Sequence, residues 1–181
     1  MSDEIQVVSI DKTIPILKHK VSNHRLIKQL ILNAIKKMGT YSFINNYQRI
    51  TNTDWHLSNE FDRPYYEYVS PIIDNVRNEV SQYFKYNEDK ITLTNCWFQQ
   101  YAKNDYHLWH SHGRSTFSCV YYVSLSDDNP KTLFRIGADE FSVEVKEGEI
   151  LTFPSFLEHV SKENTSDLIK TVVAFNLTSS D

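Results

Sequence analysis

Three histidines of this chain could together hold a metal ion. His110 and His112 lie two positions apart in the segment YHLWHSH at 106–112. Because successive side chains of an extended segment point to opposite faces, residues two apart can direct both imidazoles into one space. His159 lies far enough along the chain for an antiparallel sheet to fold back and supply a third ligand. Three protein ligands on one side of a metal leave the other positions open to small molecules, which indicates a catalytic site.

The spacing separates a fourth histidine, His107, from this set. Its odd number places it on the opposite face of an extended strand from His110 and His112, so we expect it to point away. Neutral imidazoles suit iron, zinc, copper or nickel, and the spacing alone therefore leaves the metal open.

Lys170 is the second residue with a chemical implication. It lies in the segment IKTVVAF at 169–175, which is apolar enough for a central strand. A buried ammonium is costly unless an anion meets it. The side chain either reaches past the strand end to solvent or binds a carboxylate, and we favour the second.

The N-terminal half is expected to supply helices and covering segments. Residues 5–17 contain one or two edge strands, since Pro15 cannot donate to a central ladder. Helical spacing of apolar residues predicts one helix from a cap at Ser22 or Asn23 to Gly39, and another over about 64–84 with Pro71 kinking it or splitting off its first turn. Residues 40–63 are expected to form a long ordered loop over the core, with no assigned role.

From about residue 90 the apolar period changes to two. Strands are predicted at 91–101, 116–125, 132–136, 141–146, 149–153, 157–162 and 169–178. Many short strands after two helices predict a mainly β fold, an antiparallel sandwich or barrel with the helices packed outside. With 181 residues, we expect a single domain over 1–181, in which 1–89 covers a β core at 90–181.

Composition excludes several classes of protein. The net charge is −4 and no dense Lys/Arg run occurs, so a general nucleic-acid surface is not expected. The N-terminus lacks the apolar core of a signal peptide and no apolar run is long enough to cross a bilayer, so we expect no membrane association and a cytoplasmic location. Cys96 and Cys119 lie in apolar strand-like segments and are expected to be buried free thiols.

The ordered set of motifs resembles the double-stranded β-helix, or jelly roll, of the iron(II)- and 2-oxoglutarate-dependent oxygenases. It looks closest to the small prolyl-hydroxylase-like proteins that phages and marine bacteria carry. The resemblance spans roughly residues 92–178. It rests on the strand ending in Tyr101, the His110-x-His112 pair, FSCVYYV at 117–123, GEILTFPS at 148–155, His159, and Lys170 leading into FNL at 175–177.

The resemblance implies a role for each metal ligand. His110 would be the first iron ligand and His159 the distal one, while His112 stands where most members have aspartate. That exchange removes a negative ligand and leaves the site one unit more positive. Glu158 is not expected to replace the missing carboxylate because it neighbours His159 and points away, and Asp105 lies in the preceding turn.

The resemblance also implies a cosubstrate pocket. Lys170 matches the basic residue, usually arginine, that pairs with the far carboxylate of 2-oxoglutarate. Lysine keeps the charge but loses the bidentate fork. Tyr122 and Tyr101 match tyrosines that bind or line this pocket, and Trp97 and Trp109 could form the wall of a substrate site, together with the loop that contains Trp55.

The implied activity is an iron(II)-, oxygen- and 2-oxoglutarate-dependent hydroxylation of a protein side chain or a small molecule. Two other interpretations stay open. One is a cupin-like three-histidine metal protein that works without 2-oxoglutarate, although Thr116 and Phe117 stand where the cupin pattern expects glutamate. The other is an inactive oxygenase fold used for binding.

Overall fold

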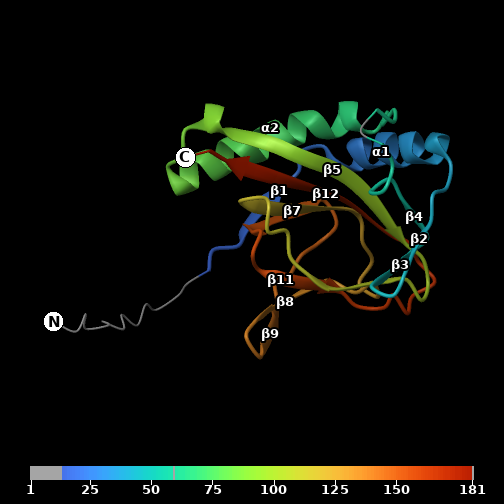
Figure 1. Ribbon diagram of the computed structural model, residues 1–181. Helices are drawn as coiled ribbons and strands as arrows, with labels where there is room; N and C mark the ends of the chain where they lie inside the picture. Colours follow the sequence, from blue (N-terminus) through green and yellow to red (C-terminus); the bar gives the residue numbers. More distant parts are fainter. Residues whose placement is uncertain (1–13, 59, 181) are drawn as a thin grey trace.

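Two antiparallel sheets face each other, and two helices cover the outer face of one of them (Figure 1). The computed structural model describes residues 14–58 and 60–180. Within these residues each sheet has six strands, and the arrangement confirms the predicted double-stranded β-helix with helices packed outside.

The sheet with the longer strands, here called the major sheet, carries the helices. Its order is β1 (Leu17–Lys20), β10 (Glu149–Pro154), β7 (Phe117–Ser124), β12 (Lys170–Ser179), β5 (Ile91–Tyr101) and β4 (Asn52–Thr53). The opposing minor sheet runs β2 (Phe43–Ile44), β3 (Gln48–Ile50), β6 (Tyr106–His110), β11 (Glu158–Ser161), β8 (Thr132–Ile136) and β9 (Asp139–Ser142). A short 3-10 helix, Glu88–Lys90, leads into β5.

The helices form where the apolar spacing predicts them. Helix α1 spans His24–Met38 and α2 spans Tyr66–Phe84. Asn23 precedes α1 without a side-chain cap bond, and Gly39 follows it with φ 92°, a conformation that favours glycine. Helix α2 continues through Pro71, so of the two effects expected of this proline, a kink or a split of the first turn, the split is absent.

Strand alternation divides the molecule into two apolar layers. Val173, Phe175 and Leu177 of β12 face the helices and pack with α1 and α2. The intervening side chains face the space between the sheets, where a second cluster gathers around Tyr122, Phe134 and other residues of both sheets. The functional residues therefore project into a space lined by both sheets, away from the helices.

Several segments differ from the sequence-based prediction. One or two edge strands were expected over residues 5–17. The described edge strand, β1, begins later, at Leu17. A first strand at 6–10 would lie outside the described residues. The strand expected at 141–146 lies earlier, at Asp139–Ser142. Residues 40–63 are not only loop, because β2, β3 and β4 extend both sheets. These strands have two or three residues each, too few for a detectable period.

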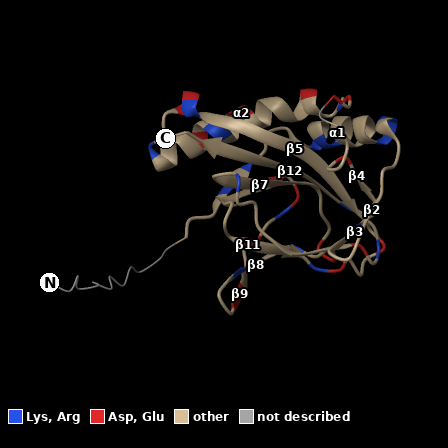
Figure 2. Cartoon of the chain, viewed as in Figure 1, with Lys and Arg blue, Asp and Glu red and all other residues tan. Residues whose placement is uncertain are grey.

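Charged residues gather on the helices and loops, whereas the central strands carry almost none (Figure 2). Across β5, β7 and β12 the only charged side chain is that of Lys170. No helix in the described part of the chain has both the length and the apolar character needed to cross a membrane.

Candidate metal centre

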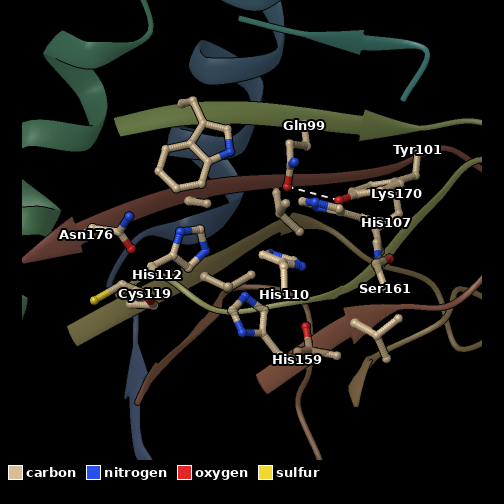
Figure 3. Close-up of a pocket in the computed structure, with 17 residues that line it drawn as sticks. Gln99, Tyr101, His107, His110, His112, Cys119, His159, Ser161, Lys170 and Asn176 are labelled. Atoms are coloured by element: carbon tan, nitrogen blue, oxygen red, sulfur yellow. Dashed lines mark hydrogen bonds between the residues drawn. The ribbon is translucent and has the colours of Figure 1, made fainter. Parts of the chain in front are cut away.

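His110, His112 and His159 converge on one point between the two sheets (Figure 3). Each offers one ring nitrogen, and these three atoms lie within 4.8 Å of one another. The ring centroids are 4.2 Å apart for His110 and His159, and 5.1 Å for His110 and His112. Among the described residues no carboxylate or thiol joins this group. The arrangement is an all-nitrogen donor set of the kind that binds divalent transition metals.

Two different backbone features bring the histidines together. His110 at the end of β6 lies directly opposite His159 of β11 in the antiparallel ladder. His112 lies two residues beyond the end of β6, where its backbone N–H donates to the carbonyl oxygen of Ser155 (2.8 Å). The predicted convergence is therefore present, but His110 and His112 do not share one strand face as expected.

The hydrogen bonds of His110 and His159 define which nitrogen is free. Nδ1 of His110 lies 2.8 Å from the carbonyl oxygen of Leu108, and Nδ1 of His159 lies 3.0 Å from that of Leu157. A carbonyl oxygen only accepts, so each Nδ1 carries the proton and each Nε2 keeps its lone pair. This second contact fixes the ring and its tautomer, as it does for metal-bound histidines in general.

Burial keeps these imidazoles neutral. It lowers the pKa of His110, lowers that of His112 to about 4 with a contribution from His110, and lowers that of His159 well below the ordinary value. Neutral imidazoles have lone pairs available for a cation, so the three rings suit a metal at neutral pH.

His107 faces the same cavity, and the expectation that it points away was wrong. Its ring stacks on that of His110 with centroids 3.8 Å apart. The reason is a β-bulge: His110 pairs with His159 and His107 with Ser161, so three steps along β6 match two along β11. The extra residue cancels the odd spacing, and the sequence gives no signal for it.

Lys170 is fully enclosed at the other side of this cavity. The side chain is 1% exposed, and Nζ donates to the carbonyl oxygen of Pro130 (2.9 Å) and to Oγ of Ser161 (2.6 Å). It also lies 4.6 Å from the centre of the Tyr101 ring. No carboxylate pairs with it among the described residues, and burial lowers the pKa of Lys170 to about 7. Lys170 therefore does not reach solvent, and its hydrogen-bond partners in the described part of the chain are neutral, so the favoured carboxylate partner stays a prediction.

The two tyrosines of the predicted cosubstrate pocket differ in their access to the cavity. Tyr101 lines it, and its hydroxyl donates to Oε1 of Gln99 (3.0 Å). Tyr122 is buried and does not line the cavity. Its hydroxyl donates to Oγ1 of Thr132 (2.6 Å), and Thr132 does line the cavity.

The two tryptophans also separate. Trp97 lines the cavity and contacts Trp55, with ring centroids 4.4 Å apart. Trp109 does not line it, because the neighbouring His110 takes the inward position; its ring lies instead under the guanidinium of Arg135 at 4.6 Å. The structure thus places Trp97, but not Trp109, at the predicted wall.

The acidic residues near the histidines are engaged elsewhere, as expected. Glu158 forms two hydrogen bonds with Arg135, both at 2.8 Å. Asp105 accepts from the backbone N–H groups of Thr51 (2.7 Å) and Ala102 (2.9 Å). Neither carboxylate is part of the histidine cluster.

Polar residues that the sequence-based reading did not single out complete the lining. They are Gln99, Ser118, Thr132, Ser161 and Asn176. Their inward alternation on β5, β7, β11 and β12 could have identified most of them once the partners of each strand were known. Cys119 also borders the cavity, and burial raises the pKa of its thiol to about 12, in line with the expected buried thiol.

Comparison with known proteins gives structural neighbours only. No family model and no curated protein matches the sequence. A prolyl-4-hydroxylase from Pseudomonas putida aligns with TM-score 0.66 and 14% identity, over 93% of this chain and 95% of that one. The viral collagen prolyl hydroxylase of Paramecium bursaria Chlorella virus-1 gives 0.66 and 12%, over 90% and 94%. HygX from Streptomyces hygroscopicus, solved with nickel and 2-oxoglutarate, gives 0.67 and 11%, over 93% and 84%. This chain therefore has the double-stranded β-helix fold found in 2-oxoglutarate- and iron(II)-dependent oxygenases.

Proposed function

We propose that this protein is an iron(II)- and 2-oxoglutarate-dependent oxygenase that hydroxylates a protein side chain or a small molecule. One observation carries the proposal: three neutral histidines and a buried lysine line a single cavity, and no carboxylate of the described residues pairs with the lysine. The fold is consistent with it, since HygX was solved with 2-oxoglutarate and nickel bound.

The histidines fit a divalent metal on the chemistry of their donor atoms. His110 and His159 each keep Nε2 free while Nδ1 donates to a backbone carbonyl, and His112 completes the set. The bound metal would supply oxygen activation, and the chain would supply its position. Three neutral ligands leave the full charge of the cation in place, which favours an anionic cosubstrate.

Lys170 fits the far carboxylate of 2-oxoglutarate. An ammonium held only by Pro130 and Ser161 has unused capacity for a charge-assisted hydrogen bond. An incoming carboxylate would compensate the burial that lowers the pKa of Lys170. His107 lines the same cavity and stacks on His110, so this ring would lie along the cosubstrate (Figure 3).

The cavity also provides for exclusion of water. Phe153 packs edge-on against His159 at a centroid distance of 4.9 Å, and Val172 and Ala174 line the same space. Apolar walls next to the histidines limit the solvent that reaches the reacting atoms.

An anaerobic titration tests the proposal. Fe(II) followed by 2-oxoglutarate should produce a visible charge-transfer band, and succinate should form once oxygen is admitted. Lys170→Ala should weaken 2-oxoglutarate binding by at least tenfold, because it removes the only lysine or arginine among the described residues that line the cavity. Lys103→Ala is the matched control, since Lys103 is half exposed and pairs with Asp167.

Other outcomes would contradict the proposal. A metal that binds while 2-oxoglutarate leaves the spectrum unchanged would indicate a three-histidine metal protein of the cupin type. A protein that binds neither would indicate a binding scaffold with an oxygenase fold.

A further inference from the structure

Two polar side chains in the cavity have no hydrogen-bond partner in the described part of the chain. They are the indole Nε1 of Trp97 and the amide Oδ1 of Asn176. Both side chains line the cavity, and the residues are 5% and 2% exposed. Buried polar groups are nearly always paired in folded proteins, so two unpaired groups in one cavity indicate a partner that is not part of the chain.

The strand register places both groups away from Lys170. Asn176 is six residues further along β12, about 20 Å of extended chain at roughly 3.3 Å per residue. Trp97 on the neighbouring strand β5 lies opposite Ala174, whose small side chain leaves room next to Asn176. The indole ring is 5.8 Å from the ring of His112, and Figure 3 shows Asn176 beside His112.

The histidine cluster therefore divides the cavity into two parts. Lys170, Tyr101 and Ser161 border the part proposed for 2-oxoglutarate, and Trp97 and Asn176 border the other. Among the described residues that line the cavity, Lys170 is the only lysine or arginine, and it borders the first part. The second part therefore offers no lysine or arginine side chain to pair with a carboxylate or phosphate group.

We propose that Trp97 and Asn176 bind an amide group of the substrate beside the metal centre. The indole N–H can only donate, so it requires an acceptor such as a carbonyl oxygen, whereas the carboxamide of Asn176 both accepts and donates. An amide offers a carbonyl oxygen and an N–H on adjacent atoms and satisfies both residues. This proposal rests on the oxygenase function, because it holds the substrate at the site where oxidation would occur.

A binding experiment tests the subsite without turnover. N-methylacetamide is titrated into the 15N-labelled protein, as isolated and after addition of Zn(II), and the indole N–H resonances are followed by NMR. Trp97→Phe, which keeps the aromatic contact but removes the donor, identifies the Trp97 signal. We expect this signal and the Asn176 side-chain amide to shift saturably, while the indole signal of Trp109, which lies outside the cavity lining, stays unchanged.

The affinities of two ligands and of three variants test the contribution of each hydrogen bond. Methyl acetate has the same shape but lacks the N–H, and it should bind about tenfold more weakly, the loss of one buried hydrogen bond. Asn176→Leu, of similar volume, should weaken N-methylacetamide binding to a similar extent, and Asn176→Ser is the second variant if the leucine substitution does not fold. Trp109→Phe, which changes a ring outside the cavity, is the matched control and should bind as the wild type does.

A further probe distinguishes the two sources of an amide. N-acetylalanine N-methylamide carries two peptide bonds; tighter binding than N-methylacetamide would assign the amide to a polypeptide, and equal binding to a small molecule. Equal affinity for the ester and the amide, or unchanged binding in both Asn176 variants, would overturn the proposal. Failure of the oxygenase function would appear separately, as absence of metal and 2-oxoglutarate binding in the wild type.

Discussion

At the scale of residues, the candidate site combines three neutral histidines with one buried lysine. The histidines stay neutral because burial lowers their pKa values, and Lys170 keeps neutral partners only. Histidine in place of the aspartate that the sequence resemblance implies makes the centre more positive at position 112. In the proposed function, that positive charge and Lys170 would both favour the binding of a small dianion.

Removal of single imidazoles tests the donor set. His110→Ala, His112→Ala and His159→Ala should each lower the affinity for Zn(II) or Co(II) by at least tenfold, because each removes one coordinating nitrogen. Isothermal titration measures the affinity. His56→Ala should leave it unchanged, since His56 is exposed and stacks on Phe43. An equal effect of all four substitutions would contradict a specific role for the three ligands.

The burial of Lys170 predicts a pH dependence of stability. Its pKa is about 7 in the folded chain and near 10.5 when unfolded, so between these values the unfolded chain binds more protons. The free energy of unfolding should therefore rise with pH in this window, by about 1.4 kcal/mol per unit relative to Lys170→Met.

The neighbouring titratable groups do not share this window. Burial raises the pKa of Tyr122 to about 12 and that of Tyr101 further, and it lowers that of His107 to about 3. Urea unfolding of wild type and Lys170→Met at pH 6, 8 and 9.5 measures the difference. Parallel pH profiles would show that Lys170 keeps an ordinary pKa.

At the scale of elements, the connections of the strands position the ligands. The bulge between β6 and β11 turns His107 inward beside His110, and the segment after β6 carries His112 to Ser155. On the other face of the major sheet, helix α1 approaches the turn before β10. There, Nδ1 of His24 lies 2.8 Å from the hydroxyl of Tyr121 on the neighbouring strand β7. The helix layer therefore fixes the major sheet from behind, at a distance from the cavity.

Gly148 sets how closely α1 approaches this turn. It has φ 87°, and a Cβ there would lie 2.8 Å from Cγ of His24. Gly148→Ala should lower the free energy of unfolding by about 2 kcal/mol or more, from backbone strain and the close contact together.

Two other glycines provide matched controls for this prediction. Gly137 also has a positive φ of 62° but open space around it, so Gly137→Ala should show only the backbone part, about 1 kcal/mol. Gly113 has open space and no positive φ, and Gly113→Ala should have almost no effect. Chemical denaturation gives all three values; equal losses at 148 and 137 would contradict a role for the His24 contact.

At the scale of the whole molecule, periodicity predicts most of the elements, including the short strands β8 and β11, and misses only the shortest ones. Strands β5, β7, β10 and β12 and both helices follow from alternation or helical spacing, since a buried face repeats over many residues. The strands β2, β3 and β4 are too short for that signal, and β6 lies in the segment expected to be extended from the spacing of its histidines.

The candidate site was predictable in its ligands but not in its surroundings. His110, His112, His159 and Lys170 stand out by residue type, so spacing was enough to bring them together. The orientation of His107 depends on a bulge, and the exclusion of Trp109 follows from the inward position of His110. The sequence gives no signal for Asn176, because the missing hydrogen-bond partner of its Oδ1 is a feature of the three-dimensional structure.

The most direct measurement is a crystal structure of the chain grown anaerobically with Mn(II) and 2-oxoglutarate, with the ion located by its anomalous scattering. The proposed function predicts one ion bound by ring nitrogens of His110, His112 and His159, and the far carboxylate of 2-oxoglutarate at Nζ of Lys170. An ion bound elsewhere, or a 2-oxoglutarate that does not contact Lys170, would contradict it.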